Sequence, residues 1–186
     1  MDIFEFILII TSVIYALAVA QILSGVSRLV QSDVPIRWYL PHTIWTVILF
    51  VYIFLVWWSA WEFRELDWQF PEYVFMVFAP TLLYMSCSLL VPQQLDPNLV
   101  DLEKHFFKVR KPLLWTFLIA TIGAVSDGNL LAGEPWWFDG REGHIAVLLA
   151  IVAGISFSNR KAQTAIATAV AAALLYVMVT RLWNPR

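Results

Sequence analysis

The chain reads WYLPHTIWTVILFVYIFLVWWSAWEFRELDW from residue 38 to residue 68. No Asp, Glu, Lys or Arg interrupts this stretch before Glu62, and about 20 apolar helical residues cross a hydrocarbon core of about 30 Å. The run ends in Trp57, Trp58 and Trp61, after which acidic residues and one arginine follow. Tryptophan suits the headgroup layer because its ring is apolar and its N–H stays near water. The stretch predicts a membrane-spanning helix ending in an aromatic belt, and an aromatic or cation-binding site is the alternative.

The rest of the chain has the same character. Of its 186 residues, 60% are hydrophobic and 14% are charged, and the mean hydropathy is +0.71. A soluble domain has about 25% charged residues, so this chain has too few to cover a water-facing surface. The single cysteine, Cys87, excludes a disulfide within one chain. We therefore predict one all-α transmembrane domain over residues 1–186, in contact with membrane lipids and not with nucleic acid.

Six segments of the chain are candidates for crossing the membrane. They are residues 2–30, 38–62, 71–91, 113–132, 143–158 and 162–183. The fifth segment is short, and the fourth contains the polar sequence Ser126-Asp127-Gly128-Asn129. Pro71 stands at the start of the third segment. Proline fits the first turn of a helix, because the N–H groups of that turn have no acceptor within the helix.

An amphipathic segment lies between the third and fourth spans. Apolar residues recur at spacings of three and four, which places one apolar stripe on a helix; they are Leu95, Leu99, Leu102, Phe106 and Val109. Asp96 and Pro97 suit the N-cap and first position of such a helix. We predict an interfacial helix at about residues 96–110, with a simple extension of the fourth span as the alternative.

Charge sets the predicted orientation. Six spans place the loops near residues 28–37, 96–112 and 158–162 on one side, with eight basic residues: Arg28, Arg37, Lys104, Lys108, Arg110, Lys111, Arg160 and Lys161. The opposite side has four: Arg64, Arg141, Arg181 and Arg186. Loops rich in Lys and Arg stay in the cytoplasm. Both termini are therefore predicted to be periplasmic or extracellular, in a multi-pass protein of the inner (plasma) membrane.

Small residues at every fourth position predict close helix packing, because they let helix backbones approach within a membrane. In the fifth span they are Ala146, Ala150 and Gly154, and in the sixth Ala165, Ala169 and Ala173. We expect these faces to pack within the chain, and assembly into an oligomer is the alternative.

Three polar side chains within the predicted spans are candidates for an ion path: Gln21, His42 and Asp127. Such groups are costly in a membrane and often functional. Gln21 and His42 are also compatible with a purely structural hydrogen-bonding role. Asp127 either lies in the outer leaflet at a helix break or is the first polar residue of an outer loop.

The predicted outer surface is acidic. A candidate rim comprises Glu62, Glu65, Asp67, Glu134 and Asp139, and acidic rings attract cations at channel mouths; a solvated rim without function is the alternative.

The sequence lacks HExxH, GxSxG, Walker and GxGxxG motifs, so we predict no catalytic residue and no metal ligand. No cofactor is predicted; a haem ligated by two histidines would require His42 and His105.

Two stretches, AVAQILSGVSRLVQ (residues 18–31) and DLEKHFFKVRKPLLW (residues 101–115), resemble segments of small uncharacterised bacterial multi-pass inner-membrane proteins. The resemblance extends over the first four predicted spans and rests on aromatic and charge patterns. It implies a bacterial inner-membrane location, and it implies no activity and no site residue.

Two functions are compatible with these features. The first is an interaction or accessory protein, acting as a subunit or scaffold of a membrane complex or as a homo-oligomer; the small-residue faces and the lack of catalytic motifs favour it. The second is a small cation channel or transporter with an acidic outer mouth.

Overall fold

A computed structural model of the chain describes residues 2–133, 135–137 and 141–181. These residues contain six α-helices: α1 (Ile3–Val30), α2 (Leu40–Ser59), α3 (Phe70–Leu90), α4 (Leu102–Leu131), α5 (Arg141–Ser156) and α6 (Arg160–Arg181). A 3₁₀ turn, η1 (Ala60–Phe63), extends α2, and two short strands are β1 (Ile36–Arg37) and β2 (Val100–Asp101). The predicted all-α bundle is confirmed.

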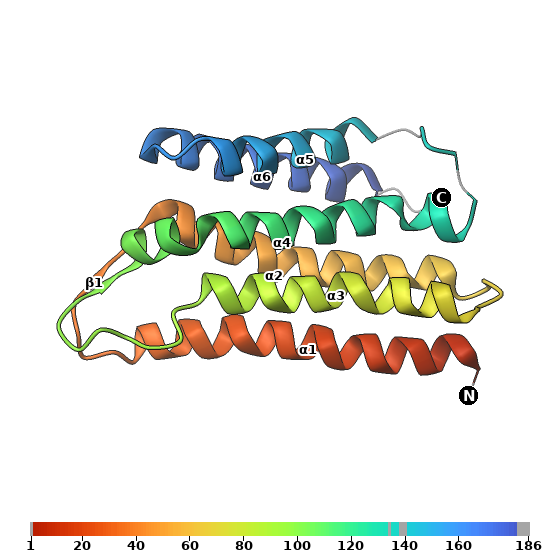
Figure 1. Cartoon of the computed structure of the whole chain (residues 1–186), viewed down its shortest axis with the longest axis horizontal. Helices are drawn as coiled ribbons and strands as arrows, with labels where there is room; N and C mark the ends of the chain where they lie inside the picture. The colour runs from red at the N-terminus through yellow and green to blue at the C-terminus, as the bar shows by residue number, and fades with distance from the viewer. Residues whose placement is uncertain (1, 134, 138–140, 182–186) are drawn as a thin grey trace.

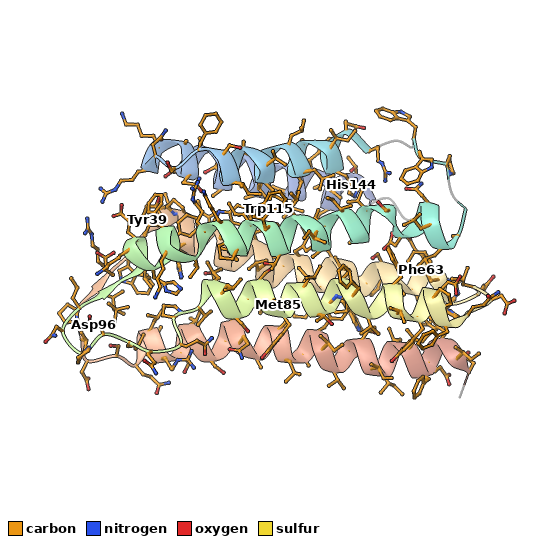
Figure 2. All side chains as sticks on the ribbon, in the orientation of Figure 1. Tyr39, Phe63, Met85, Asp96, Trp115 and His144 are labelled. Carbon is orange, nitrogen blue, oxygen red and sulfur yellow. The ribbon has the colours of Figure 1, made fainter. Side chains whose placement is uncertain are left out.

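The helices lie along one axis, so the connections between them alternate between two ends (Figure 1). α1 forms one edge and packs on α3, while α5 and α6 form the opposite edge and pack on α4 and α2. We call residues 28–39, 91–112 and 156–162 the basic end, and residues 2–5, 60–72, 127–133 and 141–144 the acidic end. Tyr39 and Asp96 lie toward the basic end, and Phe63 and His144 toward the acidic end (Figure 2).

Five helical segments among the described residues are long and apolar enough to cross a membrane: α1, α2 with η1, α3, α4 and α6. α5 has 16 residues, fewer than the about 20 that a crossing normally takes. By length and composition the bundle therefore has five candidate spans, one fewer than the sequence predicted. Large apolar side chains such as Ile9, Phe54 and Leu149 lie exposed on its outside, as a lipid-facing surface requires.

α1 packs through a regular stripe of buried residues spaced by three and four: Phe4, Ile7, Thr11, Tyr15, Ala18, Ile22, Gly25 and Leu29. At the acidic end Asp2 and Glu5 form a capping box, in which each side chain accepts the backbone N–H of the other. At the basic end Gly25 lies directly against Val91, the C-cap residue that follows α3. A side chain at position 25 has no room at this contact.

The predicted interfacial helix at residues 96–110 is not a separate element. α4 is one continuous helix from Leu102 with Pro112 inside it, as the extension alternative proposed. Val100 and Asp101 pair in parallel with Ile36 and Arg37, so this stretch is extended and helix formation starts after it. Asp101, rather than Asp96, accepts the first-turn N–H of Lys104, at 2.9 Å. Of the five residues in the predicted apolar stripe, Leu102, Phe106 and Val109 lie in α4, whereas Leu95 and Leu99 precede the helix.

Ionic contacts join the connections at the basic end. Arg37 contacts Asp101 at 3.2 Å and Glu103 at 3.4 Å, and Glu103 also pairs with Arg160 at the start of α6. The N–H of Lys104, assisted by the charge of Arg37, lowers the pKa of the Asp101 carboxyl. Exposed pairs contribute little singly and more as a network. The network links the segment before α2 to the starts of α4 and α6.

The predicted packing faces of α5 and α6 are only partly the buried ones. Gly154 is buried and Ala150 and Ala173 are half-buried, but the others are exposed, namely Ala146, Ala165 and Ala169. The buried residues are Arg141, Gly143, Val147, Ile151 and Gly154 on α5, and Gln163, Ala167, Val170 and Leu174 on α6. A strict four-residue step rotates about 40° further round a helix each time, so it leaves the contact face after two steps.

Candidate functional site: a cavity at the acidic end

A cavity of about 170 Å³ lies between α2, α4, α5 and α6 toward the acidic end. Seven of its lining residues are polar: Tyr52, Ser59, Glu62, Thr121, Asp127, Asn129 and His144. Its walls are otherwise apolar and include Leu55, Val56, Trp58, Val147, Leu174, Val177 and Met178. On α4 the lining extends from Thr121 to Asn129, about 12 Å along the helix axis. Much of the cavity therefore lies beside helices rather than loops.

Aromatic side chains lie below the cavity, toward the basic end. Tyr52 lines the cavity, and its ring meets that of Phe117 edge-on with 5.1 Å between centroids. Phe117 in turn meets Trp45 at 5.7 Å, and both of these side chains are fully buried. The cavity thus ends on a packed aromatic column.

Asp127 lies within α4 and not at a break in it. The helix continues through Gly128 and Asn129 to Leu131, so neither predicted setting, a helix break or an outer loop, describes this residue. The N–H of Gly128 donates to the Asp127 carboxylate at 2.7 Å. Asp127 also lines a second cavity of about 20 Å³, on the side facing Tyr15 and Met76. Asp127 therefore borders both cavities.

Arg141 fastens the start of α5 to the end of α4 beside the cavity. It is buried, and it donates to the Val125 carbonyl at 2.8 Å and to the Asn129 side-chain oxygen at 3.0 Å. Its guanidinium also lies 5.8 Å from the centre of the Trp136 ring. A cation near a helix C-terminus is favourable because the last carbonyls carry partial negative charge. Arg141 thereby fixes the wall formed by α4 and α5.

The predicted acidic rim is only partly associated with the cavity. Glu62 lines it, while Glu65 and Asp67 are exposed and do not. Glu65 instead pairs with Arg64 at 3.2 Å. Glu134 and Asp139 lie outside the described residues. Among the three rim residues that the structure describes, Glu62 alone lines the cavity.

The four tryptophans between residues 57 and 68 have two different settings. Trp58 and Trp61 are exposed near the acidic end, and Trp57 donates its ring N–H to Ser12 at 2.9 Å. Trp68 is instead buried and stacks on Phe4, with 6.3 Å between ring centroids. The first three have the exposure expected of a belt, and Trp58 also lines the cavity.

The remaining candidates for an ion path, Gln21 and His42, are not brought to Asp127. Gln21 contacts the Tyr84 hydroxyl at 3.5 Å between α1 and α3. His42 is buried at the basic end, where its ring lies 6.3 Å from that of His105. His105 and Asp127 are 22 residues apart on α4, about 33 Å. The three candidates therefore do not line one cavity.

The two histidines have a shared structural role. Nε2 of His42 and Nε2 of His105 each lie 3.0 Å from the carbonyl oxygen of Leu90, the last residue of α3. Since a carbonyl only accepts, these nitrogens carry the protons. The last carbonyls of a helix lack partners within it, and the two rings supply them. In the part of the chain that the structure describes, no three His, Cys, Asp or Glu side chains are grouped to hold a metal ion.

Sequence reasoning did not identify Tyr52, Thr121 or His144 as site residues, because the cavity is assembled from four helices and no local pattern marks it. Polar side chains near the acidic ends of three predicted spans were the available signal. The resulting site combines two carboxylates with aromatic and aliphatic walls.

The chain matches no model of a known protein family, no curated protein and no solved structure.

Proposed function

We propose that this chain is a bacterial inner-membrane protein that crosses the membrane six times and acts as a subunit or scaffold of a membrane complex or homo-oligomer. α5 supports the sixth crossing, because it joins the acidic end of α4 to the basic end of α6 (Figure 1). Its 16 residues extend about 24 Å, which slight local thinning of the bilayer accommodates. The excess of Lys and Arg at the basic end supports its location in the cytoplasm.

The observation that carries the association is an exposed face of small residues on α6. Ala165, Thr168, Ala169 and Ala172 follow the spacing of one helix face, and all four are exposed. Elsewhere the outer surface presents large side chains, such as Phe54 and Leu149. The hydrophobic effect contributes little to helix association within lipid. The affinity between two membrane helices therefore comes mainly from close approach of their backbones at small residues. This face suits another helix better than it suits lipid chains.

α1 offers a second face of this kind at the opposite edge of the bundle. Ala16, Ala20 and Ser24 are exposed there, next to the stripe that packs inward. Two different faces at two edges allow a chain to contact a neighbour on each side. The arrangement fits a member of a larger assembly.

We expect the protein to leave the membrane as an assembly under gentle extraction, and Ala169→Phe to dissociate it. The added ring prevents close approach at the α6 face while leaving the buried residues untouched. Native mass spectrometry of the extracted protein measures the mass and composition of the assembly. Leu149→Phe is the matched control, since it exchanges one large exposed apolar side chain for another and is expected to change nothing.

A monomer in the mildest extraction conditions, or an assembly that Ala169→Phe leaves intact, contradicts this function. The composition of the assembly distinguishes copies of this chain from other membrane proteins.

Passage of cations through one chain is the less supported alternative. The cavity with Asp127 and Glu62 favours the entry of cations from the acidic end. Below it, however, Trp45, Leu114 and Phe117 are fully buried and fill the interior. Gln21 and His42 contribute to contacts elsewhere. The observed features support binding at one end more than passage to the other.

A further inference from the structure

We propose that the cavity between α2, α4, α5 and α6 is a binding site for a small organic cation, namely a protonated amine that carries one ring-sized apolar group. The site is separate from the exposed faces of α6 and α1, so it does not depend on the proposed association. It requires only that the acidic end be open to the aqueous phase from which the amine enters.

The volume sets the size of the ligand. The cavity measures about 170 Å³, and a cavity of roughly 150 Å³ in a protein interior holds a benzene molecule. A single ring with a short substituent therefore fills it. Val147, Leu174 and Val177 provide apolar wall from α5 and α6. These contacts favour a hydrocarbon body over a fully hydrated inorganic ion, which has no apolar surface to bury.

The charge of the ligand follows from the side chains and helix ends around it. Asp127 and Glu62 line the cavity from α4 and η1. α2, α4 and α6 all direct their C-termini toward this end (Figure 1), and each helix C-terminus carries about half a negative charge. Only α5, among the four surrounding helices, points its N-terminus there. The electrostatic environment favours a cation.

The basic groups nearby do not reverse the preference of the cavity for a cation. Arg141 donates to the Val125 carbonyl and the Asn129 side chain and is not among the lining residues. His144 lines the cavity as well. A cation at the mouth also meets the ring of Trp58, whose face attracts positive charge.

Different residues of the cavity contact the ammonium and the ring of the ligand. Asp127 and Glu62 accept from the ammonium near the mouth, while the ring extends toward the floor at Tyr52. An edge-on contact there resembles the one Tyr52 already makes with Phe117. Orientation thus comes from two carboxylates at one end and an aromatic floor at the other.

The test uses the full-length protein in lipid nanodiscs, with benzylammonium as probe and benzyl alcohol as its neutral counterpart. Isothermal calorimetry gives each dissociation constant at neutral pH. We expect benzylammonium to bind about tenfold or more tightly than benzyl alcohol, and Asp127→Asn to remove about tenfold in affinity, because a charge-assisted contact is lost. Glu62→Gln is expected to weaken binding in the same direction. It changes an exposed side chain, so it remains informative if Asp127→Asn fails to fold.

Glu65→Gln is the matched control, because it removes the same charge from the same end but from outside the cavity; it should leave the affinity within about twofold. The proposal is overturned if the amine and the alcohol bind equally, or if Asp127→Asn and Glu62→Gln both retain full affinity. It is also overturned if mass spectrometry finds a phospholipid retained in the cavity that benzylammonium does not displace.

Discussion

Gly25→Ala is expected to destabilise the bundle by about 2 kcal/mol, since overpacking a tight contact costs 1–3 kcal/mol. A Cβ at this position would lie 2.0 Å from Cγ1 of Val91 and 2.9 Å from its Cγ2. Rotating Val91 does not relieve the clash, because its own Cβ is only 3.0 Å away. The contact of α1 with the end of α3 therefore has to open. Thermal unfolding in detergent, followed by tryptophan fluorescence, measures the loss.

Gly123→Ala is the matched control for this substitution. Gly123 also lies inside a helix, but a Cβ there meets its nearest neighbour, Ala79, at 4.0 Å, an ordinary contact. Alanine favours helix over glycine by up to about 1 kcal/mol, so this variant should be as stable as the wild type or more so. The double variant Gly25→Ala/Val91→Ala should recover part of the stability, since it removes the two γ-methyl groups. Equal stability of Gly25→Ala and Gly123→Ala would show that α1 and α3 do not approach as described.

Arg110→Leu is expected to cost about 2 kcal/mol, because hydrogen bonds to charged groups contribute roughly 1.5–3 kcal/mol. Arg110 is buried at the basic end, where it donates to the carbonyls of Gly154, at 2.8 Å, and Phe157. Gln163 donates to the same two carbonyls. The last carbonyls of α5 have no partners within their own helix. Without the arginine, the short α5 loses these two hydrogen bonds to α4.

Lys111→Leu is the control for Arg110→Leu, because the neighbouring side chain is exposed and its charge has the same sign. It should leave the unfolding temperature nearly unchanged. The unfolding temperature of Arg110→Lys should lie between those of the other two variants, since a single ammonium replaces the several N–H donors of the guanidinium. Hydrogen exchange would place the loss of protection for Arg110→Leu in α5. Equal effects of Arg110→Leu and Lys111→Leu would contradict a capping role for Arg110.

The long helices were predictable because the signal for them is local. α1 extends over Ile3–Val30, within one residue of the predicted start, since a capping acid and an uninterrupted apolar run specify it. The start of α4 was not predictable in this way. Val100 pairs with Ile36 from a segment 64 residues earlier, and periodicity contains no information about such a partner.

The cavity was predictable only in part. Asp127 and Glu62 were candidates because acids near or within apolar runs are conspicuous. Tyr52 and Thr121 come from two different helices, and their meeting depends on how those helices rotate. The same rotation explains Ala146 and Ala165, which sequence spacing placed inside and the structure leaves exposed. A helix face is decided by all its neighbours together, not by one repeated residue type.

The central claim is that the chain crosses the membrane six times, with the cavity-bearing acidic end outside. Single cysteines at exposed positions test it in a Cys87→Ala background, since Cys87 is the only native cysteine. Ala132 and Ser158 flank α5 at the acidic and basic ends, and Glu65 and Asn98 mark the same two ends independently. A membrane-impermeant maleimide is applied to intact cells and then to permeabilised cells. We predict that Glu65→Cys and Ala132→Cys react in intact cells, and that Asn98→Cys and Ser158→Cys react only after permeabilisation. Reaction of Ala132→Cys and Ser158→Cys from the same side would contradict the account.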